Sequence, residues 1–89
     1  MKILAVCGAG VGTSVLLKMN AEKALRNLDL EAEVVAVNLA TALETQDAQV
    51  ILTTPDLVDK LVGTRSEVIA IEGLFDLNEI SEKLEKAIG

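Results

Sequence analysis

Four short, largely apolar runs, separated by segments with helical spacing, constrain the fold more than any other feature of the sequence. The runs cover Ile3–Val6, Glu33–Val37, Val50–Thr53 and Val68–Ile71. Strands of a parallel sheet are covered by helices on both faces, so their sequences are continuously apolar instead of alternating. The pattern therefore predicts an α/β fold built on a parallel sheet.

The segments between the runs predict the helices of this fold. We expect helices over Ser14–Asn27, Leu39–Glu44, Pro55–Val62 and Leu77–Ile88. Alternating strands and helices with right-handed connections predict three layers, α-β-α, around four parallel strands in the order 2-1-3-4. Ligands of open α/β sheets bind where this order reverses, between the first and third strands. The fold would therefore bring the loop after the first strand close to Thr53, Thr54 and Pro55.

Polar residues indicate where several helices begin. Thr54 fits the cap of the third helix, and Asn38 and Thr41 are alternative starts of the second. Asp76 and Glu79 have the spacing of a capping box, in which each side chain accepts a hydrogen bond from the backbone of the other. These positions predict where the second, third and fourth helices begin, and therefore where the connections from the preceding strands end.

Length and composition limit the classes of function. The 89 residues predict a single domain, residues 1–89, and no apolar run approaches the roughly 18 residues that span a membrane. A net charge of −6 offers no basic patch for nucleic acid. One cysteine and no histidine exclude an internal disulfide and histidine-based metal sites or triads, and a free thiol fits the reducing cytoplasm.

A glycine-rich loop follows the first strand and begins with the cysteine, Cys7. Residues 7–14 read CGAGVGTS, and Thr13 or Ser14 fits the cap of the following helix. Backbone N–H groups of such a loop, together with a helix N-terminus, form a site for an anion in front of the thiol. That environment would lower the pKa of the thiol and favour the thiolate. The loop therefore predicts a reactive cysteine.

Two other functions of glycine-rich loops fit the sequence less well. A P-loop requires a lysine directly before Thr13 or Ser14, and the nearest lysine is Lys18. A dinucleotide-binding fingerprint requires a third glycine where this chain has Thr13. A purely structural role for Cys7 as a small buried residue is a further alternative, because free cysteines are often buried.

The segment CGAGVGTS after a short first strand resembles the phosphocysteine loop of IIB components of the bacterial phosphoenolpyruvate-dependent sugar phosphotransferase system (PTS). The resemblance is to the lactose/ascorbate/galactitol-type group. It extends over the whole chain in length and element order and is sharpest over Ile3–Met19. The residues SVLLKM after the loop look most like ascorbate-type members, with galactitol-type proteins as near neighbours.

This resemblance implies a phosphotransferase component whose Cys7 accepts a phosphoryl group from a phosphohistidine of a IIA protein. The group would then pass to a sugar bound by the membrane protein IIC, without a metal or a cofactor. By the same resemblance, the loop residues hold the phosphoryl group: Gly8, Ala9, Gly10, Val11, Gly12, Thr13 and Ser14. An apolar rim of Val11, Val15, Leu16 and Pro55 is expected to dock the partners, and Thr53 and Thr54 are further candidate contacts.

Two other classes of function remain open. The loop also resembles that of low-molecular-weight tyrosine phosphatases, which suggests a small cysteine-dependent phosphatase or an arsenate-reductase-like enzyme. Those phosphatases have an arginine where this chain has Thr13, and an Asp-Pro pair where this chain has the reverse order, Pro55-Asp56. Without the guanidinium, a bidentate clamp on the phosphoryl oxygens is missing. The second class is a regulatory domain that binds an anion without catalysis.

Overall fold

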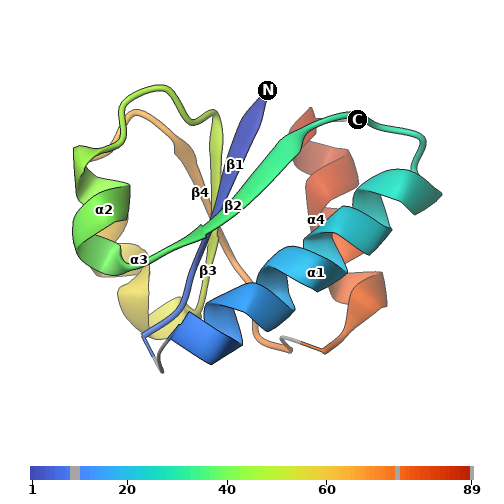
Figure 1. Cartoon of the computed structure of the whole chain (residues 1–89), viewed down its shortest axis with the longest axis horizontal. Coiled ribbons are helices and arrows are strands. Elements are labelled where there is room, and N and C mark those ends of the chain that lie inside the picture. Colours follow the sequence, from blue (N-terminus) through green and yellow to red (C-terminus); the bar gives the residue numbers. More distant parts are fainter. Residues whose placement is uncertain (9–10, 74, 89) are drawn as a thin grey trace.

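A sheet of four parallel strands forms the centre of the computed structural model, which describes residues 1–8, 11–73 and 75–88 (Figure 1). The strands lie in the order β2-β1-β3-β4, which confirms the predicted topology. In chain order the elements are β1 (Lys2–Val6), α1 (Val11–Asn27), β2 (Glu33–Val37), α2 (Leu39–Glu44), β3 (Val50–Thr53), the 3₁₀ turn η1 (Pro55–Leu57), α3 (Val58–Leu61), β4 (Glu67–Ala70) and α4 (Leu77–Ile88).

Helices cover both faces of the sheet, so the predicted three-layer arrangement is correct (Figure 1). Helices α1 and α4 pack on one face, over alternate residues of β1 such as Ile3 and Ala5. Helices α2 and α3 with η1 pack on the other face, over Leu4 and Val6. Both sets of β1 residues are almost fully buried because successive side chains of a strand point to opposite faces.

The strand register aligns the four chain segments that leave the sheet at its carboxyl edge. Val6 of β1 pairs with Val37 of β2 and with Thr53 of β3, and Thr53 in turn pairs with Ala70 of β4. The residue after each strand therefore lies at the same edge. This edge holds Cys7 after the central strand β1.

Several predicted boundaries differ from the structure by a few residues. Helix α1 begins at Val11, three positions before the predicted start at Ser14. A hydroxyl side chain is compatible with the first turn as well as with the cap, because N–H groups there need no acceptor within the helix. Strand β4 begins and ends one residue earlier than predicted, and the helix after Thr54 is split into η1 and a short α3 that ends at Leu61.

The turn between β4 and α4 corrects the predicted capping box. The backbone N–H of Glu79 donates to Asp76 Oδ1 over 3.1 Å, which is one half of the motif. The Glu79 carboxylate, however, accepts from the backbone N–H groups of Glu72 at 2.9 Å and Gly73 at 2.8 Å. The turn folds back over the start of the helix. The Glu79 carboxylate therefore accepts from two N–H groups of the preceding loop, and not from the backbone N–H of the cap residue Asp76.

Candidate functional site

Cys7 directly follows the buried strand β1 and is itself 7% exposed. Its side chain packs with the cluster of apolar residues between the sheet and helices α1 and α4. The prediction that Cys7 lies at the carboxyl end of a central strand is therefore correct. Strand β1 is paired on both sides, with β2 and with β3, so hydrogen bonds from two strands hold the backbone that leads to the sulfur.

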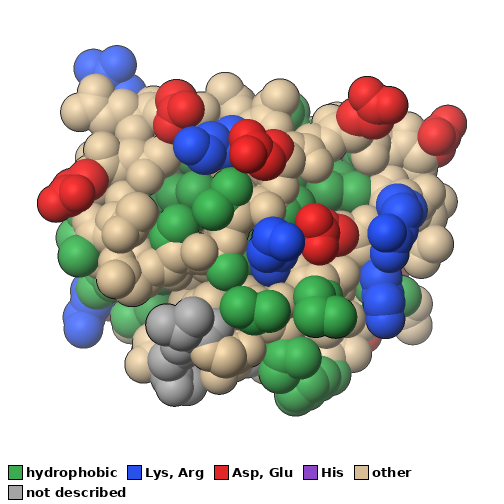
Figure 2. Space-filling model, in the orientation of Figure 1, with side chains coloured by type: hydrophobic (Ala, Val, Ile, Leu, Met, Phe, Trp, Pro, Cys, Tyr) green, Lys and Arg blue, Asp and Glu red, His purple; other side chains and the backbone are tan. Residues whose placement is uncertain are grey.

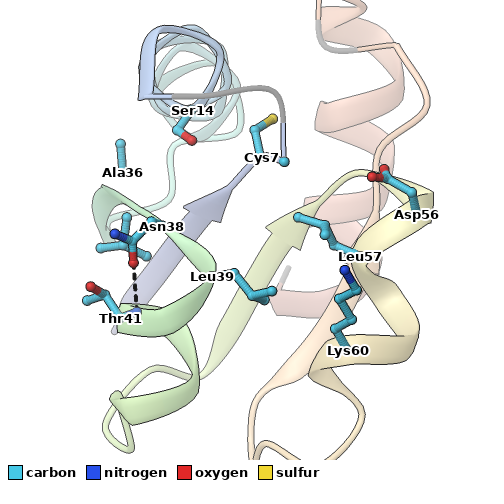
Figure 3. Close-up of a pocket in the computed structure, with 11 residues that line it drawn as sticks. Cys7, Ser14, Ala36, Asn38, Leu39, Thr41, Asp56, Leu57 and Lys60 are labelled. Atoms are coloured by element: carbon cyan, nitrogen blue, oxygen red, sulfur yellow. Dashed lines mark hydrogen bonds between the residues drawn. The ribbon is translucent and has the colours of Figure 1, made fainter.

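A cavity of about 680 Å³ opens beside Cys7 at the carboxyl edge of the sheet (Figure 3). One wall comes from the end of β2 and the start of α2, and the opposite wall comes from η1 and α3. The lining residues are Cys7, Gly8 and Ser14, then Ala36, Val37, Asn38, Leu39 and Thr41, and finally Asp56, Leu57 and Lys60. The switch point between β1 and β3 is thus a hollow of the size that small ligands occupy.

The loop residues that the sequence singled out take different positions. Gly8 and Ser14 line the cavity with Cys7, and Ser14 is only 3% exposed. Thr13 and Ser14, the predicted alternatives for the cap, lie within the first four residues of α1, as does Gly12. Neither Gly8 nor Gly12 has a left-handed φ, so glycine is not required there by backbone conformation.

The remaining loop predictions concern Val11, Ala9 and Gly10. Val11 is the first residue of α1. Ala9 and Gly10 lie outside the described residues, so their predicted contact with a phosphoryl group stays a prediction.

The predicted lowering of the Cys7 pKa is wrong for the free chain. Burial raises the pKa of the Cys7 thiol above its ordinary value, and the negative charge of Asp56 raises it further. Asp56 projects from η1 toward the Cys7 side of the cavity (Figure 3). A Cβ atom added to Gly8 would lie 3.4 Å from Asp56 Oδ2, so this carboxylate is close to the backbone next to the cysteine.

The predicted meeting of the cysteine loop with Thr53, Thr54 and Pro55 is only partly correct. The residues that line the cavity come from the segment that starts directly after Pro55, namely Asp56, Leu57 and Lys60. Thr54 occupies the cap position of η1, but its side chain makes no capping hydrogen bond. Within the described part of the chain, the Oγ1 atoms of Thr53 and Thr54 are buried and have no hydrogen-bond partner.

Sequence reasoning missed one whole wall of the cavity. Asn38 and Thr41 line it, although the sequence indicated them only as alternative starts of α2. The structure selects Asn38 as the cap, since its side chain accepts from the backbone N–H of Thr41 at 2.8 Å. The strand order could have found this wall, because it places the residue after β2 beside the residue after β1.

Apolar side chains are exposed on the first half of α1. Val15 is 40% exposed, Leu16 39% and Met19 48%. Figure 2 shows hydrophobic side chains gathered on this face of the molecule. Val15 and Leu16 are therefore available on the surface, as predicted for a docking rim, and Met19 extends this apolar α1 patch. Pro55 is also exposed.

The described residues contain no group of three or more histidine, cysteine, aspartate or glutamate side chains arranged to hold a metal ion. Among the same residues, no helix has both the length and the apolar character that crossing a membrane requires.

Comparison with known proteins identifies the family. The sequence model of the family described as "PTS system, Lactose/Cellobiose specific IIB subunit" matches residues 2–86. The chain belongs to this family. It is therefore a IIB component of a phosphotransferase system and has a role in sugar transport.

Two relatives support the assignment to the IIB family. The ascorbate-specific PTS system EIIB component of Mycoplasma pneumoniae is 30% identical over 90 residues, which cover 99% of this chain and 95% of the relative. The solved lactose-specific IIB component domain from Streptococcus pneumoniae matches the fold with a TM-score of 0.72 at 13% identity, over 100% of this chain and 98% of that chain. The similar architecture thus extends over the entire IIB domain.

Proposed function

We propose that this IIB component carries a phosphoryl group on Cys7 between a IIA protein and a sugar bound by a membrane IIC protein. The observation that supports this most strongly is the position of the sole cysteine. It directly follows β1, one of the two central strands, at the switch point of the sheet and lines a cavity there. Ligands of open α/β sheets bind at this point, outside the carboxyl ends of the strands.

In the first step of this cycle, the Cys7 sulfur attacks the phosphorus of a phosphoimidazole on IIA. The S–P bond forms as the N–P bond breaks, the imidazole nitrogen keeps the electron pair of that bond, and it takes up the thiol proton. In the second step a sugar hydroxyl oxygen attacks the phosphorus, the sulfur keeps the S–P electrons, and the hydroxyl proton returns to it. Phosphoryl transfer depends mainly on positioning and charge stabilisation, so no metal or cofactor is invoked.

The residues proposed to hold the phosphoryl group are the loop residues Gly8 to Ser14. The first N–H groups of a helix have no acceptor within that helix, and helix N-termini are suited to phosphoryl oxygens. The buried hydroxyl of Ser14 lines the cavity and adds a polar group to the same wall. Because burial and Asp56 disfavour negative charge on Cys7, these donors would have to offset both effects in the phosphorylated state.

A carrier role fits this site better than hydrolysis does. Asp56 and Cys7 line the same cavity, and a phosphatase would also need a carboxyl group near its cysteine as the general acid. The other charged residue of the cavity is Lys60, and Thr13 stands where phosphatases have their arginine. An ammonium group cannot form the planar two-pronged contact of a guanidinium with phosphoryl oxygens.

The proposed sugar class follows the relative from Mycoplasma pneumoniae, which is described as ascorbate-specific. We extend this class to the present chain, with a galactitol-type sugar as the alternative. The proposed partners dock on the exposed apolar α1 patch of Val15, Leu16 and Met19, next to the loop that follows Cys7. The proposed location is the cytoplasm, where thiols stay reduced.

Intact mass spectrometry tests the carrier role. The chain is incubated with phosphoenolpyruvate, the general phosphotransferase proteins and candidate IIA proteins, and Cys7→Ser is treated in parallel. The expected result is one phosphoryl adduct that maps to Cys7 and is absent from Cys7→Ser. Steady hydrolysis of an aryl phosphate without an adduct would instead assign a phosphatase. Absence of both signals with every IIA protein would favour an anion-binding regulatory domain.

A further inference from the structure

The hydroxyl group of Thr54 makes no hydrogen bond within residues 1–8, 11–73 and 75–88, the part of the chain that the structure describes. Thr54 precedes η1 at the cap position, yet its side chain makes no capping hydrogen bond. Its Oγ1 atom is buried and has no hydrogen-bond partner among the described residues. The large majority of buried side-chain polar atoms in native proteins have a hydrogen-bond partner, and an exception calls for an explanation, a catalytic role among them.

The register of the sheet places Thr54 beside Cys7. Val6 pairs with Thr53, so the next residue of each strand, Cys7 and Thr54, continues the same alignment. Neighbouring strands lie about 4.8 Å apart. The backbone of Thr54 is still extended, with φ −83° and ψ 155°, so side chains continue to alternate between the faces of the sheet.

This alternation separates Thr54 from Thr53. Cys7 and Leu52 belong to the apolar cluster under α1 and α4, and alternation puts Thr54 on that same face. Val6 and Ile51 belong to the cluster under α2 and α3, and Thr53 shares their face. Only one of the two unpartnered hydroxyl groups therefore lies on the same side of the sheet as the cysteine.

We propose that the Thr54 hydroxyl is a donor held for the charged states of Cys7, the thiolate and the phosphocysteine. This inference rests on the proposed carrier function and adds a positioning residue outside the glycine-rich loop. A hydroxyl proton can rotate to face an adjacent anion. Hydrogen bonds to charged groups are the stronger kind, and burial strengthens them because water does not compete.

The charged and polar groups that line the cavity show what a donor at Thr54 would add. Among the residues that line the cavity, the charged ones are Asp56 and Lys60, both from the η1–α3 segment. Helix α1 contributes the neutral Ser14 to the cavity, and the start of α2 contributes Asn38, whose side-chain oxygen already accepts from Thr41. Asp56 opposes negative charge on the sulfur, so a donor on the α1–α4 side of the sheet offsets part of that effect.

The first test measures the Cys7 thiolate without any partner protein. The rate of iodoacetamide alkylation of the full chain is followed across pH for wild type, Thr54→Val, Thr54→Ser and Thr53→Val. Valine has the shape of threonine without the hydroxyl, and Thr53→Val makes the same change on the opposite face. We expect Thr54→Val to be alkylated about tenfold more slowly at pH 8, because a charge-assisted hydrogen bond is lost. Thr54→Ser should be close to wild type.

The controls decide whether the effect belongs to the hydroxyl. Thr53→Val should keep the wild-type profile, and circular dichroism should show that all variants are folded. Equal alkylation profiles for Thr54→Val and Thr53→Val would overturn the proposal. A slower Thr54→Ser would also count against it, because that variant retains the hydroxyl.

The second test keeps this inference distinguishable from the carrier role. Phosphorylation by phosphoenolpyruvate, the general proteins and a IIA protein is measured on the same variants, and Thr54→Val should reach a lower extent than Thr53→Val. If wild type accepts no phosphoryl group but Thr54→Val still alkylates more slowly, the carrier function fails while the donor to the thiolate stands. If wild type is phosphorylated and the two valine variants behave alike, only the Thr54 proposal fails.

Discussion

Two turns at the same edge of the sheet differ in whether their polar side chains have hydrogen-bond partners within the described chain. In the β4–α4 turn, the Glu79 carboxylate accepts from Glu72 and Gly73 and forms an ion pair with Lys83 at 2.7 Å. At the Cys7 site, the Thr54 hydroxyl is buried without a partner in the described chain, and burial raises the pKa of the thiol. In the β4–α4 turn the carboxylate is hydrogen-bonded within the chain, whereas at the Cys7 site a buried hydroxyl has no partner among the described residues.

This difference distinguishes Glu79, which stabilises the fold, from Thr54 and Cys7, which we assign to the function. Internal hydrogen bonds to a charged group hold that group in its charged form, so the pKa of Glu79 is lowered to about 2. An unpartnered buried hydroxyl lowers the stability of the free chain instead. Such local cost is common at functional sites and is tolerated because the surrounding sheet is well paired.

The largest effect is expected from removing the charge of the completed turn. Glu79→Gln should lower the free energy of unfolding at pH 7 by about 2 kcal/mol, because charge-assisted hydrogen bonds from Glu72, Gly73 and Lys83 are weakened. Chemical denaturation measures this loss. Glu82→Gln, an exposed change in the same helix, is the matched control and should stay within about 0.5 kcal/mol.

The same carboxylate gives a pH signature. The pKa of Glu79 is lowered from the ordinary value of 4.5 to about 2, mainly by the hydrogen bond from Lys83. Its contribution is therefore complete above pH 4.5 and is lost as the pH falls toward 2. Glu79→Gln should lose less stability than wild type across this interval. Parallel acid titrations of the two proteins would contradict the assignment.

Glycine substitutions compare the packing of the two turns. A Cβ atom at Gly73 would lie 2.9 Å from Asp76 Cβ, whereas at Gly8 the closest contact would be 3.4 Å, to Asp56 Oδ2. Gly73→Ala should therefore cost about 1–2 kcal/mol through overpacking, and Gly8→Ala should stay within about 0.5 kcal/mol. Thermal unfolding of both variants checks this. A larger loss for Gly8→Ala would mean that the Cys7 site is the more tightly packed turn.

The fold was predictable because its signals are local and repeated. Continuous apolar runs predicted a parallel sheet, and the strand order followed from rules on connections. The reciprocal capping box failed because two N–H groups of the preceding loop, from Glu72 and Gly73, compete for Glu79. Spacing along one helix start contains no information about a loop that folds back onto it.

The candidate site was predictable in its centre and less so in its walls. Cys7 followed from the glycine-rich loop, and its edge of the sheet followed from the topology. The direction of its pKa did not, because burial and the approach of Asp56 depend on how η1 packs against the residue next to Cys7. The sequence showed only that Pro55-Asp56 reverses the Asp-Pro order of the phosphatases, and the structure adds that Asp56 of the 3₁₀ turn lines the cavity.

The smallest effect is expected from Asp56→Asn, which changes the charge next to Cys7 and is measured on the Cys7 thiol itself. Removing this negative charge should lower the pKa of the Cys7 thiol relative to wild type, so alkylation near neutral pH should become faster. The change should be modest and should shrink as salt is added, because Asp56 is exposed and its field is screened.

Asp59→Asn, one turn further along the same segment, provides the matched control and should leave the alkylation profile of Cys7 unchanged. Equal profiles for wild type and Asp56→Asn would mean that burial alone raises the thiol pKa. The Cys7 site would then differ from the β4–α4 turn in missing donors only. A shift with Asp56→Asn alone would mean that the site also contains a charge that opposes the thiolate, which a docking partner with a cationic group could neutralise.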